Sequence, residues 1–286
     1  MNLQNGLKKS FLKMNKCIVM FSNGLDSRLV MKIMQERGFE IIAVHNKFPF
    51  SKNVDEEVEK FCKEQKIKLK VFDFTKNKLL QDYLKIIRKP KFGKGTALNP
   101  CIDCRILGLK VAKKFADSKK IKIIATGEVL NQRPMSQHAK AMKIVEKKSG
   151  LNERLLRPLS DYGIKGRRRI EQMKLAKKFK ITYPGSGGGC LLCEKEYCKK
   201  LEKVLDKKLS SDDIKLLSVG RHFESSEIIL GRDKKENDIL EKHKGWKVLP
   251  KQPGATALVK YKKDIEKSKE LIKKYSKHEL EEFEIK

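Results

Sequence analysis

The sequence predicts an α/β protein: a doubly wound parallel sheet covered by helices, followed by a smaller α+β domain. Short continuous apolar runs, such as CIVMF at 17–21, are typical of strands buried in a parallel sheet. Each run is followed by a segment in which apolar residues recur at helical spacing. The connections between these segments are short, and repeated strand–helix units of this kind build a parallel sheet with helices on its faces.

Strand and helix patterns alternate through the first half of the chain. The expected strands lie at 17–21, 41–44, 69–72 and 121–128. The expected helices lie at 29–34, 54–62, 79–87 and from Cys101 to about 115. Ligands of such a fold bind at the carboxyl ends of the strands, and the candidate motifs fall in loops at those ends.

The pattern changes after about residue 150, where Pro and Gly become frequent. LLRPLSDYG is followed by a basic segment expected to be a helix over 165–180, and then by the loop YPGSGGGCLLC. We expect an N-terminal extension at 1–15, a first domain at 16–206, a charged linker at 207–213 and a second domain at 214–286. The second domain reads as short strands with one helix, a Lys-rich helix and a terminal strand.

The charge of the chain points to a polyanionic partner. The 286 residues include 67 Lys and Arg against 36 Asp and Glu, a net charge of +31. Nucleic acid is the leading candidate, and a generally Lys-rich proteome is the alternative explanation. No apolar run approaches the roughly 18 residues of a membrane span, and the N-terminus does not resemble a signal peptide. We therefore expect a cytoplasmic protein with no membrane partner.

The loop SNGLDS, between the first strand and the first helix, has the features of a phosphate-binding loop. Small residues allow backbone N–H groups to approach a phosphate, and the helix N-terminus favours anions. Ser22, Gly24 and Ser27 are candidates for phosphate contacts, and Asp26 for Mg²⁺. The loop is neither a Walker A loop nor a GxGxxG loop. The alternative is a tight turn in which Asp and Ser cap the helix.

The seven cysteines, an odd number, indicate thiol or metal chemistry more than disulfides. Cys101 and Cys104 form a CxxC at the expected start of a helix, a position that lowers the pKa of a thiol. Cys190 and Cys193 form a second CxxC. Zinc is the metal most often bound by two such pairs, and an iron–sulfur cluster suits ligation by cysteines equally well. The remaining cysteines are expected to be structural: Cys17, Cys62 and Cys198.

Basic residues gather in two places along the first domain. Arg167, Arg168 and Arg169 lie on the helix expected at 165–180, and Lys91 and Lys94 lie in the loop that precedes the first CxxC. Both groups are candidates for RNA phosphates. The alternative for the helix is an ordinary solvated face.

These motifs together resemble a known superfamily. SNGLDS resembles the SGGxDS loop of PP-loop ATP pyrophosphatases, with Asn23 where that family most often has Gly. NPCIDC (99–104) resembles the NPCxxC of the tRNA-thiolating branch, the 4-thiouridine synthetases and tRNA 2-thiouridylases. ATGEVLNQRPMSQ (125–137) is similar to a second motif of that branch, and GGGCLLC supplies its partner cysteine. The resemblance covers residues 16–206, and the order of the motifs is specific.

The resemblance implies an adenine nucleotide α hydrolase-like fold and the chemistry of a tRNA sulfurtransferase. ATP and Mg²⁺ would bind at Ser22, Gly24, Asp26, Ser27, Thr126 and Gly127. A uridine oxygen of tRNA would be adenylated with release of pyrophosphate, and sulfur from sulfide or a persulfide carrier would displace AMP. We expect 4-thiouridine as the product ahead of 2-thiouridine. The oligomeric state is left open, with a homodimer among the alternatives.

Two roles for the cysteines fit this chemistry. In one, Cys101 and Cys190 are the catalytic pair: one carries a persulfide and the other resolves the intermediate as a disulfide. In the other, Cys101, Cys104 and Cys190 hold a 4Fe–4S cluster. We favour the cluster because Cys104 has no role in the first scheme. Zinc is the alternative metal, and Cys193 as a fourth ligand would favour a structural site.

The C-terminal stretch resembles the RNA-binding domain NFACT-R. The matching pieces are HFES at 222–225, GRDKKEND at 231–238 and the Pro253–Gly254 pair. This resemblance implies that the second domain binds tRNA, with Arg221 and Arg232 as candidate contacts. Two other functions stay open: a PP-loop enzyme acting on a small molecule, and a non-catalytic, zinc-stapled RNA-binding protein with a degenerate PP-loop.

Overall fold

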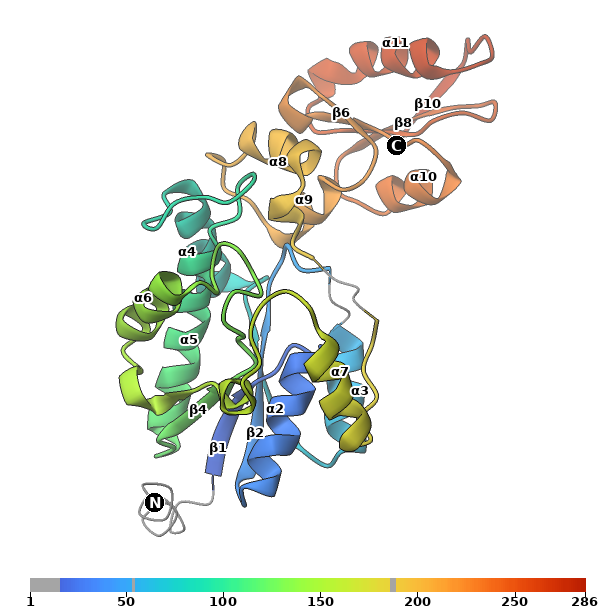
Figure 1. Cartoon of the computed structure of the whole chain (residues 1–286). Helices are drawn as coiled ribbons and strands as arrows, with labels where there is room; N and C mark the ends of the chain where they lie inside the picture. The colour runs from blue at the N-terminus through green and yellow to red at the C-terminus, as the bar shows by residue number, and fades with distance from the viewer. Residues whose placement is uncertain (1–15, 53–54, 186–188) are drawn as a thin grey trace, which may run out of the picture. The chain divides into compact units, whose positions relative to one another are not determined.

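The computed structural model describes residues 16–52, 55–185 and 189–286 (Figure 1). The predicted extension at 1–15, the glycines at 187–188 and the start of the helix expected at 54 lie outside these ranges. The chain divides into two compact units after Cys193. The sequence had placed the end of the first domain at 206, and the expected linker at 207–213 includes the first residues of a helix, Ser211–Leu216.

The N-terminal unit is built on a parallel five-stranded sheet with the order β3-β2-β1-β4-β5. Its strands are β1 (Lys16–Met20), β2 (Glu40–Lys47), β3 (Lys68–Asp73), β4 (Ile123–Thr126) and β5 (Leu155–Leu156). Every neighbouring pair is parallel. The doubly wound parallel sheet predicted from the sequence is therefore confirmed.

The central strand β1 shows why the apolar runs become strands. Cys17, Ile18 and Val19 are all fully buried. Cys17 and Val19 belong to the core on one face of the sheet, and Ile18 to the core on the other. Because successive side chains of a strand point to opposite faces, a strand covered on both sides needs a continuous apolar run.

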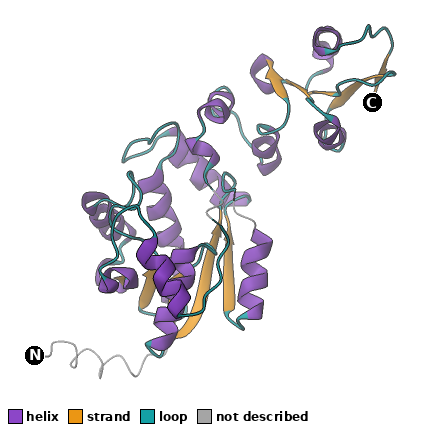
Figure 2. Cartoon of the chain, turned by 45° about the vertical axis from the view of Figure 1, so that its right-hand side comes forward, coloured by secondary structure: helices purple, strands orange, loops and turns teal. Residues whose placement is uncertain are grey.

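Helices cover both faces of this sheet (Figures 1 and 2). One face packs against α2 (Leu25–Glu36), α3 (Asp55–Glu64) and α7 (Ile170–Lys178). The other packs against α5 (Cys101–Ser118) and α6 (Ala139–Ser149), and α4 (Asn77–Arg88) lies against α5. Among the described residues, no helix is long and apolar enough to cross a membrane.

The sheet places two motif-bearing loops side by side. After β1 the chain builds outward through β2 and β3, and it then returns to the other side of β1 to form β4. The strand order therefore reverses between β1 and β4. Such a switch point opens a crevice at the carboxyl ends of the two strands, which is where α/β folds bind ligands. The loops that leave these two strands begin at Phe21 and Gly127.

Two elements are shorter in the structure than the sequence predicted. The basic helix expected at 165–180 is α7 alone, so Arg167 and Arg168 lie before it and Arg169 is its N-cap. The physical reason is Gly166, whose φ of +85° is incompatible with a right-handed helix. The strand expected at 121–128 ends at Thr126, where the chain leaves the sheet to form a loop.

The C-terminal unit is the smaller α+β domain that the sequence predicted, and its sheet is antiparallel. Its helices are α8 (Lys195–Glu202), α9 (Ser211–Leu216), α10 (Lys234–Glu241) and α11 (Ile265–Tyr275). Its strands are β6 (Arg221–Phe223), β7 (Ile228–Leu230), β8 (Trp246–Pro250), β9 (Ala257–Val259) and β10 (Phe283–Ile285), in the order β10-β8-β9-β7-β6. The core against α11 lies on one face, and a smaller core against α10 lies on the other.

Candidate nucleotide and cysteine site

The loop after β1 forms a compact turn at the N-terminus of α2. The Ser27 hydroxyl donates to the carbonyl oxygen of Gly24 at 2.9 Å and accepts from the backbone N–H of Ser22 at 3.3 Å. Gly24 is the N-cap of the helix, and its side-chain position is empty apart from Ser22 Oγ at 3.7 Å. The first backbone N–H groups of α2 are therefore presented at the carboxyl edge of the sheet, where they favour an anion.

Asn23 adopts the backbone conformation that the glycine of SGGxDS would provide. Its φ is +65°, in the left-handed region that Asn tolerates better than most residues. The side-chain Oδ1 of Asn23 accepts from Arg28 Nη2 at 2.7 Å, which directs the amide away from the turn. Arg28 in turn lies over the ring of Phe61, 3.9 Å from its centroid. Asn23 is thus accommodated in this turn by its left-handed backbone and by the hydrogen bond from Arg28.

The loop after β4 passes directly against this turn. A Cβ atom on Gly127 would lie 2.9 Å from the Asp26 carbonyl carbon and 3.0 Å from the Ser27 nitrogen. Both are backbone atoms, so only glycine allows the two loops to approach this closely. The neighbouring Thr126 is buried and accepts from Arg105 Nη2 at 3.1 Å. The fold therefore brings together the residues predicted to bind the nucleotide: Ser22, Gly24, Asp26, Ser27, Thr126 and Gly127.

Asp26 is the centre of a polar cluster with unused hydrogen-bonding capacity. Gln132 Nε2 donates to Asp26 Oδ2 at 3.0 Å, and Arg169 Nη2 lies 3.5 Å from the same oxygen. Among the described residues, Asp26 Oδ1, Gln132 Oε1 and Arg169 Nε are buried without a hydrogen-bond partner. Two acceptors and one donor on three neighbouring side chains are thus left without partners, and buried polar atoms normally have partners.

The sequence analysis did not single out Gln132, and it assigned Arg169 to RNA. Gln132 lies inside the motif 125–137, so its place in that motif was the available signal. Arg169 was grouped with Arg167 and Arg168 because the three are adjacent. The structure separates them: Arg167 and Arg168 are exposed, while Arg169 is half-buried against Asp26.

The cysteines come together because the segment around Cys190 pairs with two distant loops. The backbone N–H of Leu191 donates to the Phe50 carbonyl at 2.9 Å, and the Leu98 N–H donates to the Leu192 carbonyl at 3.1 Å. Leu98 directly precedes the NPCIDC motif. Cys190 is therefore held close enough to Cys101 and Cys104 for the thiols to influence one another electrostatically.

The thiols lie against an aromatic wall. Cys104 Sγ lies 3.7 Å from the hydroxyl oxygen of the buried Tyr83, whose ring packs against Phe48 and Phe50. Burial raises the pKa of Cys104 to about 12 and that of Cys190 to about 12. For Cys104 this corrects the lowered pKa expected at a helix N-terminus, because desolvation of the thiolate outweighs the helix dipole.

The three cysteines are of the type that holds an all-cysteine prosthetic group, and they come from two separate segments. Asn99 Nδ2 donates to Cys101 Sγ at 3.3 Å, a contact that favours electron-rich sulfur. Within the described ranges, however, no group of three or more His, Cys, Asp or Glu residues is arranged so that it could hold a metal ion.

A buried ion network connects α5, the helix that begins at Cys101, to the loop after β4. Glu128, after β4, is fully buried; it accepts from Arg105 Nε at 2.9 Å and Arg157 Nε at 3.2 Å. Arg157 also donates to Glu146 of α6 at 2.7 Å. Burial alone would raise the pKa of Glu128, but the two guanidinium groups outweigh it and hold that pKa below its ordinary value. Because Arg105 directly follows Cys104, the network links the helix that carries Cys101 and Cys104 to the loop after β4.

The remaining residues predicted to bind RNA differ in their availability. Lys91 and Lys94 are exposed on a loop that Asp103 of α5 ties down through the Lys91 N–H at 3.2 Å. Arg221 is exposed and lies over the ring of Tyr275, 4.9 Å from its centroid. Arg232, by contrast, is bound through its guanidinium to Glu236 in its own unit.

Comparison with known families supplies the classification. The family model described as thiamine biosynthesis protein (ThiI) matches residues 13–186, more than half of the chain. The chain belongs to the ThiI family. The match includes the loop after β1, the NPCIDC motif and the loop after β4. It ends before Cys190 and does not reach the C-terminal unit.

Individual relatives of this ThiI-family chain carry names from tRNA modification. A tRNA-specific 2-thiouridylase MnmA from a Nitratiruptor species is 30% identical over 118 residues, which cover 39% of this chain and 34% of that protein. The chain thus matches about a third of the length of this curated relative.

Two solved structures are similar to the chain. One is a crystal structure of a 4-thiouridine synthetase–RNA complex with bound ATP, with 20% identity, a TM-score of 0.48, and coverage of 71% of this chain and 52% of that one. The other is a predicted subunit of a tRNA methyltransferase from Methanocaldococcus jannaschii DSM, with 18% identity, a TM-score of 0.42, and coverage of 70% and 91%.

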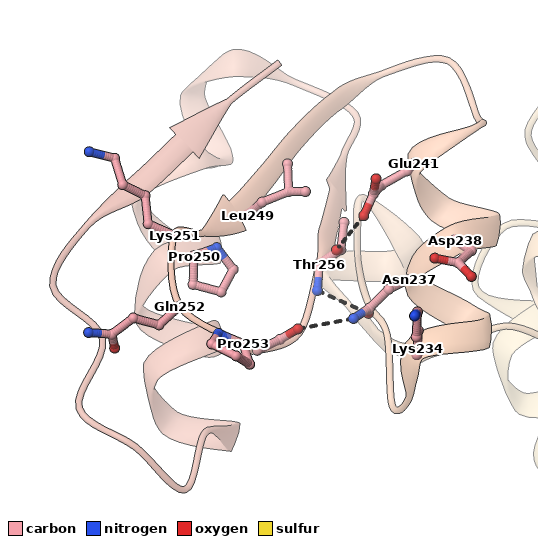
Figure 3. A pocket seen from close by; sticks show the side chains of 11 residues that line it. Lys234, Asn237, Asp238, Glu241, Leu249, Pro250, Lys251, Gln252, Pro253 and Thr256 are labelled. Carbon is pink, nitrogen blue, oxygen red and sulfur yellow. Dashed lines mark hydrogen bonds between the residues drawn. The ribbon is translucent and has the colours of Figure 1, made fainter.

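In the C-terminal unit of this ThiI-family chain, the motif GRDKKEND has a structural role. Asp233 caps α10 by accepting from the Glu236 N–H at 2.9 Å. Asn237 donates to the Gly254 carbonyl at 3.0 Å and accepts from the Thr256 N–H at 3.0 Å (Figure 3). These bonds hold the Pro253–Gly254 turn beside α10 and leave an open hollow of about 390 Å³ between them. Two of the three pieces that the sequence comparison singled out, GRDKKEND and Pro253–Gly254, are thus joined in one local structure.

Proposed function

We propose that this ThiI-family chain is an ATP-dependent tRNA sulfurtransferase. The observation that carries the proposal is the cluster of unpaired polar atoms at the switch point: Asp26 Oδ1, Gln132 Oε1 and Arg169 Nε. A polyphosphate ligand satisfies such a set, because its oxygens accept from Arg169. Its accompanying Mg²⁺ takes the carboxylate oxygen of Asp26. Each of these three residues lies in or beside a loop that the family model covers.

The nucleotide would bind across the two adjacent loops. The N–H groups at the start of α2, with the Ser22 and Ser27 hydroxyls, contact phosphate oxygens. Asp26 Oδ1 holds Mg²⁺, which when bound neutralises charge on the phosphates. We reassign Arg169 from RNA to the nucleotide, where its guanidinium stabilises the pyrophosphate leaving group. A uridine carbonyl oxygen attacks the α-phosphorus, and the bond to the β-phosphate oxygen breaks.

Sulfur then replaces the adenylated oxygen. A sulfur nucleophile adds to the ring carbon, the C–O bond breaks, and AMP leaves with the former uridine oxygen. In the two-cysteine version, the sulfur is the terminal atom of a persulfide on Cys101 or Cys190. The other cysteine attacks the remaining S–S bond, which leaves a Cys101–Cys190 disulfide that an external thiol must reduce. Adenylation is needed because a carbonyl oxygen is otherwise a poor leaving group.

We favour the cluster version, in which Cys101, Cys104 and Cys190 hold a 4Fe–4S group. When bound, the group supplies an iron position that binds the sulfur to be transferred. The chain supplies three ligands and the aromatic wall of Tyr83 and Phe48, which excludes water. Anaerobic purification followed by iron and sulfide analysis tests this version, and a colourless, iron-free and fully active protein would contradict it.

The proposed substrate is tRNA. Residues 1–193 contain 43 Lys and Arg against 17 Asp and Glu, a net charge of +26. Lys91, Lys94, Arg167 and Arg168 are exposed in this unit and are proposed to contact the phosphate backbone. The C-terminal unit is proposed as a second RNA-binding element, as its NFACT-R-like pieces imply, with Arg221 as a contact. Arg232 is a poorer candidate because Glu236 already binds it.

The function is tested by incubating tRNA with the protein, ATP, Mg²⁺ and sulfide. Pyrophosphate release and nucleoside mass spectrometry are measured together, and digestion mapping locates the modified uridine. We expect tRNA-stimulated pyrophosphate release and thiouridine, with 4-thiouridine ahead of 2-thiouridine. Asp26→Asn should lose both signals, whereas Cys190→Ser should lose thiouridine and retain pyrophosphate release.

The matched control is Cys198→Ser, a change to a buried cysteine of the other unit, which should keep both signals. Pyrophosphate release that ignores tRNA, without thiouridine, would instead identify an enzyme acting on a small molecule. The lack of both signals in a protein that binds tRNA would identify a non-catalytic RNA-binding protein.

A further inference from the structure

The C-terminal unit exposes two large aromatic rings at one end of its sheet. Trp246 is 38% exposed and Tyr261 is 43% exposed. Trp246 begins β8 and pairs with Val259, the last residue of β9, and Tyr261 follows two residues later. Both aromatic residues therefore lie at the same end of the β8–β9 pair, and Tyr261 comes four residues before the start of α11.

Three lysines accompany these rings. Lys262 Nζ lies 5.6 Å from the centroid of the Trp246 ring. Lys260 Nζ and Lys263 Nζ lie 5.4 Å and 5.7 Å from the centroid of the Tyr261 ring. We refer to Trp246, Lys260, Tyr261, Lys262 and Lys263 as the aromatic–lysine patch. In this patch, lysine ammonium groups lie over the faces of both aromatic rings.

The core of the unit does not require these rings. Val248 and Val259 are fully buried and belong to the cluster that packs against α11. Trp246 lies at the end of this row and retains more than a third of its accessible surface. A single exposed apolar side chain is ordinary, but an indole and a phenol beside three cations form a surface with a specific ligand chemistry.

That chemistry matches single-stranded RNA better than its alternatives. Proteins that bind unpaired nucleotides use aromatic rings as stacking platforms and adjacent cations for the phosphates. In a duplex the faces of the bases are covered, so a ring has nothing to stack on. Protein–protein interfaces also use Trp and Tyr, but their buried centres are depleted in Lys. Three lysines within four positions therefore argue against a protein partner.

We infer that the aromatic–lysine patch binds unpaired nucleotides of RNA, with bases stacked on Trp246 and Tyr261 and phosphates at the lysines. This inference rests on the proposed function for the identity of the RNA, which would be an unpaired segment of the substrate tRNA. It assigns the C-terminal unit the recognition of single-stranded RNA. The phosphate contacts of the N-terminal unit carry no such selectivity.

Because Trp246 is the single tryptophan of the chain, its fluorescence reports on the patch alone. The full-length protein is titrated with an oligouridine of about ten nucleotides, a length within the site sizes of single-strand binding domains. A duplex RNA of equal length and inorganic polyphosphate serve as the matched probes. We expect oligouridine to quench the Trp246 emission saturably, and we expect the duplex and polyphosphate to leave it nearly unchanged.

Variants measured by anisotropy of a labelled oligouridine separate stacking from charge. Trp246→Ala and Tyr261→Ala should each weaken binding by about 5- to 100-fold, and Trp246→Phe by much less. Tyr162→Ala is the matched control, because Tyr162 is 47% exposed in the other unit; it should bind normally. Thermal melts of each variant verify folding.

Three results would overturn the inference: no quenching by oligouridine, equal quenching by polyphosphate, or a blue shift with anionic lipid vesicles in the absence of any RNA effect. The first result would show that the patch does not bind unpaired RNA. The second would show that it binds any polyanion through charge alone, and the third that it binds a membrane surface. Thiouridine formation is measured on the same preparation. Thiolation without quenching would overturn the patch alone, and quenching without thiolation would overturn the proposed function alone.

Discussion

His222 is held in the C-terminal unit as a neutral imidazole. Its Nε2 lies 2.8 Å from the Val219 carbonyl and 3.1 Å from the Leu216 carbonyl, so this nitrogen carries the proton. Its Nδ1 accepts from the Ser226 hydroxyl at 3.0 Å. Burial lowers the pKa of His222 from 6.5 to about 4, and the nearby charges of Lys200 and Arg232 add to this effect. Protonation would remove the acceptor used by Ser226 and place a third cation in the group.

The pH dependence of stability follows from that lowered pKa. A group whose pKa is lower in the folded state contributes stability above pH 6.5, and this is lost as the pH falls toward 4. Thermal unfolding of the C-terminal unit, followed by Trp246 emission, should therefore shift to lower temperature over this window. His222→Gln retains a donor and an acceptor without titrating, so its curve should be flatter. Equal pH slopes for the variant and the parent protein would contradict this prediction.

At the scale of elements, Glu128 joins four parts of the N-terminal unit. It follows β4, and its two partners are Arg105 on α5 and Arg157 after β5. Arg157 extends the network to Glu146 of α6. The guanidinium of Arg105 also donates to the hydroxyl of Thr126, the last residue of β4, just before the loop that contacts the turn after β1. The network therefore fixes the position of the cysteine helix relative to the carboxyl end of β4.

Removing the charge of Glu128 should be costly. Glu128→Gln leaves the largely buried Arg157 and the partly exposed Arg105 without their carboxylate, and breaking a buried pair in this way costs up to about 3–5 kcal/mol. Urea unfolding at pH 7 measures the loss of stability. Glu153→Gln is the matched control because Glu153 is exposed, and it should change stability by less than about 0.5 kcal/mol. A loss for Glu128→Gln no larger than the control would show that the network does not support the fold.

The elements that the sequence predicted well are those whose signal is local. The run Cys17–Phe21, the small residues after it and the helical spacing of Leu29, Val30 and Ile33 fix a strand, a turn and a helix within twenty residues. The φ of +65° at Asn23 was likewise readable, since Asn is tolerated where glycine is usual. The basic helix was extended too far because nothing in its charge pattern revealed the left-handed Gly166.

The contacts that complete the site were not readable, because they join residues far apart in the chain. Asp26 and Arg169 are 143 positions apart, and their approach depends on how α7 packs beside α2. Burial of the Cys104 thiol raises its pKa against the opposing hydrogen bond with Tyr83, which comes from a different helix. The motifs predicted which residues take part in the site, whereas the tertiary fold decides which of them touch.

At the scale of the whole molecule, the net charge of +31 is unevenly divided. Residues 1–193 carry +26, whereas residues 194–286 have 24 basic and 19 acidic residues, a net charge of +5. Long-range attraction of a polyanion therefore arises mainly from the N-terminal unit. The stacking contacts that we propose for the C-terminal unit, which has little net charge, should be weakened less by salt.

The salt dependence of the proposed tRNA binding tests this division. Each phosphate contact contributes about 0.9 to the slope of log affinity against log salt concentration. Lys91→Gln/Lys94→Gln should therefore lower that slope by up to about 1.8. The matched control, Lys119→Gln/Lys120→Gln, removes the same charge from exposed positions just beyond the C-terminal end of α5. That end lies about 25 Å from the cysteine end, given 1.5 Å per residue, so the slope should remain close to that of the parent protein. Trp246→Ala should weaken binding at every salt concentration without changing the slope. If both lysine pairs lower the slope equally, the charge acts as a diffuse field and the loop at 91–94 is not a phosphate contact.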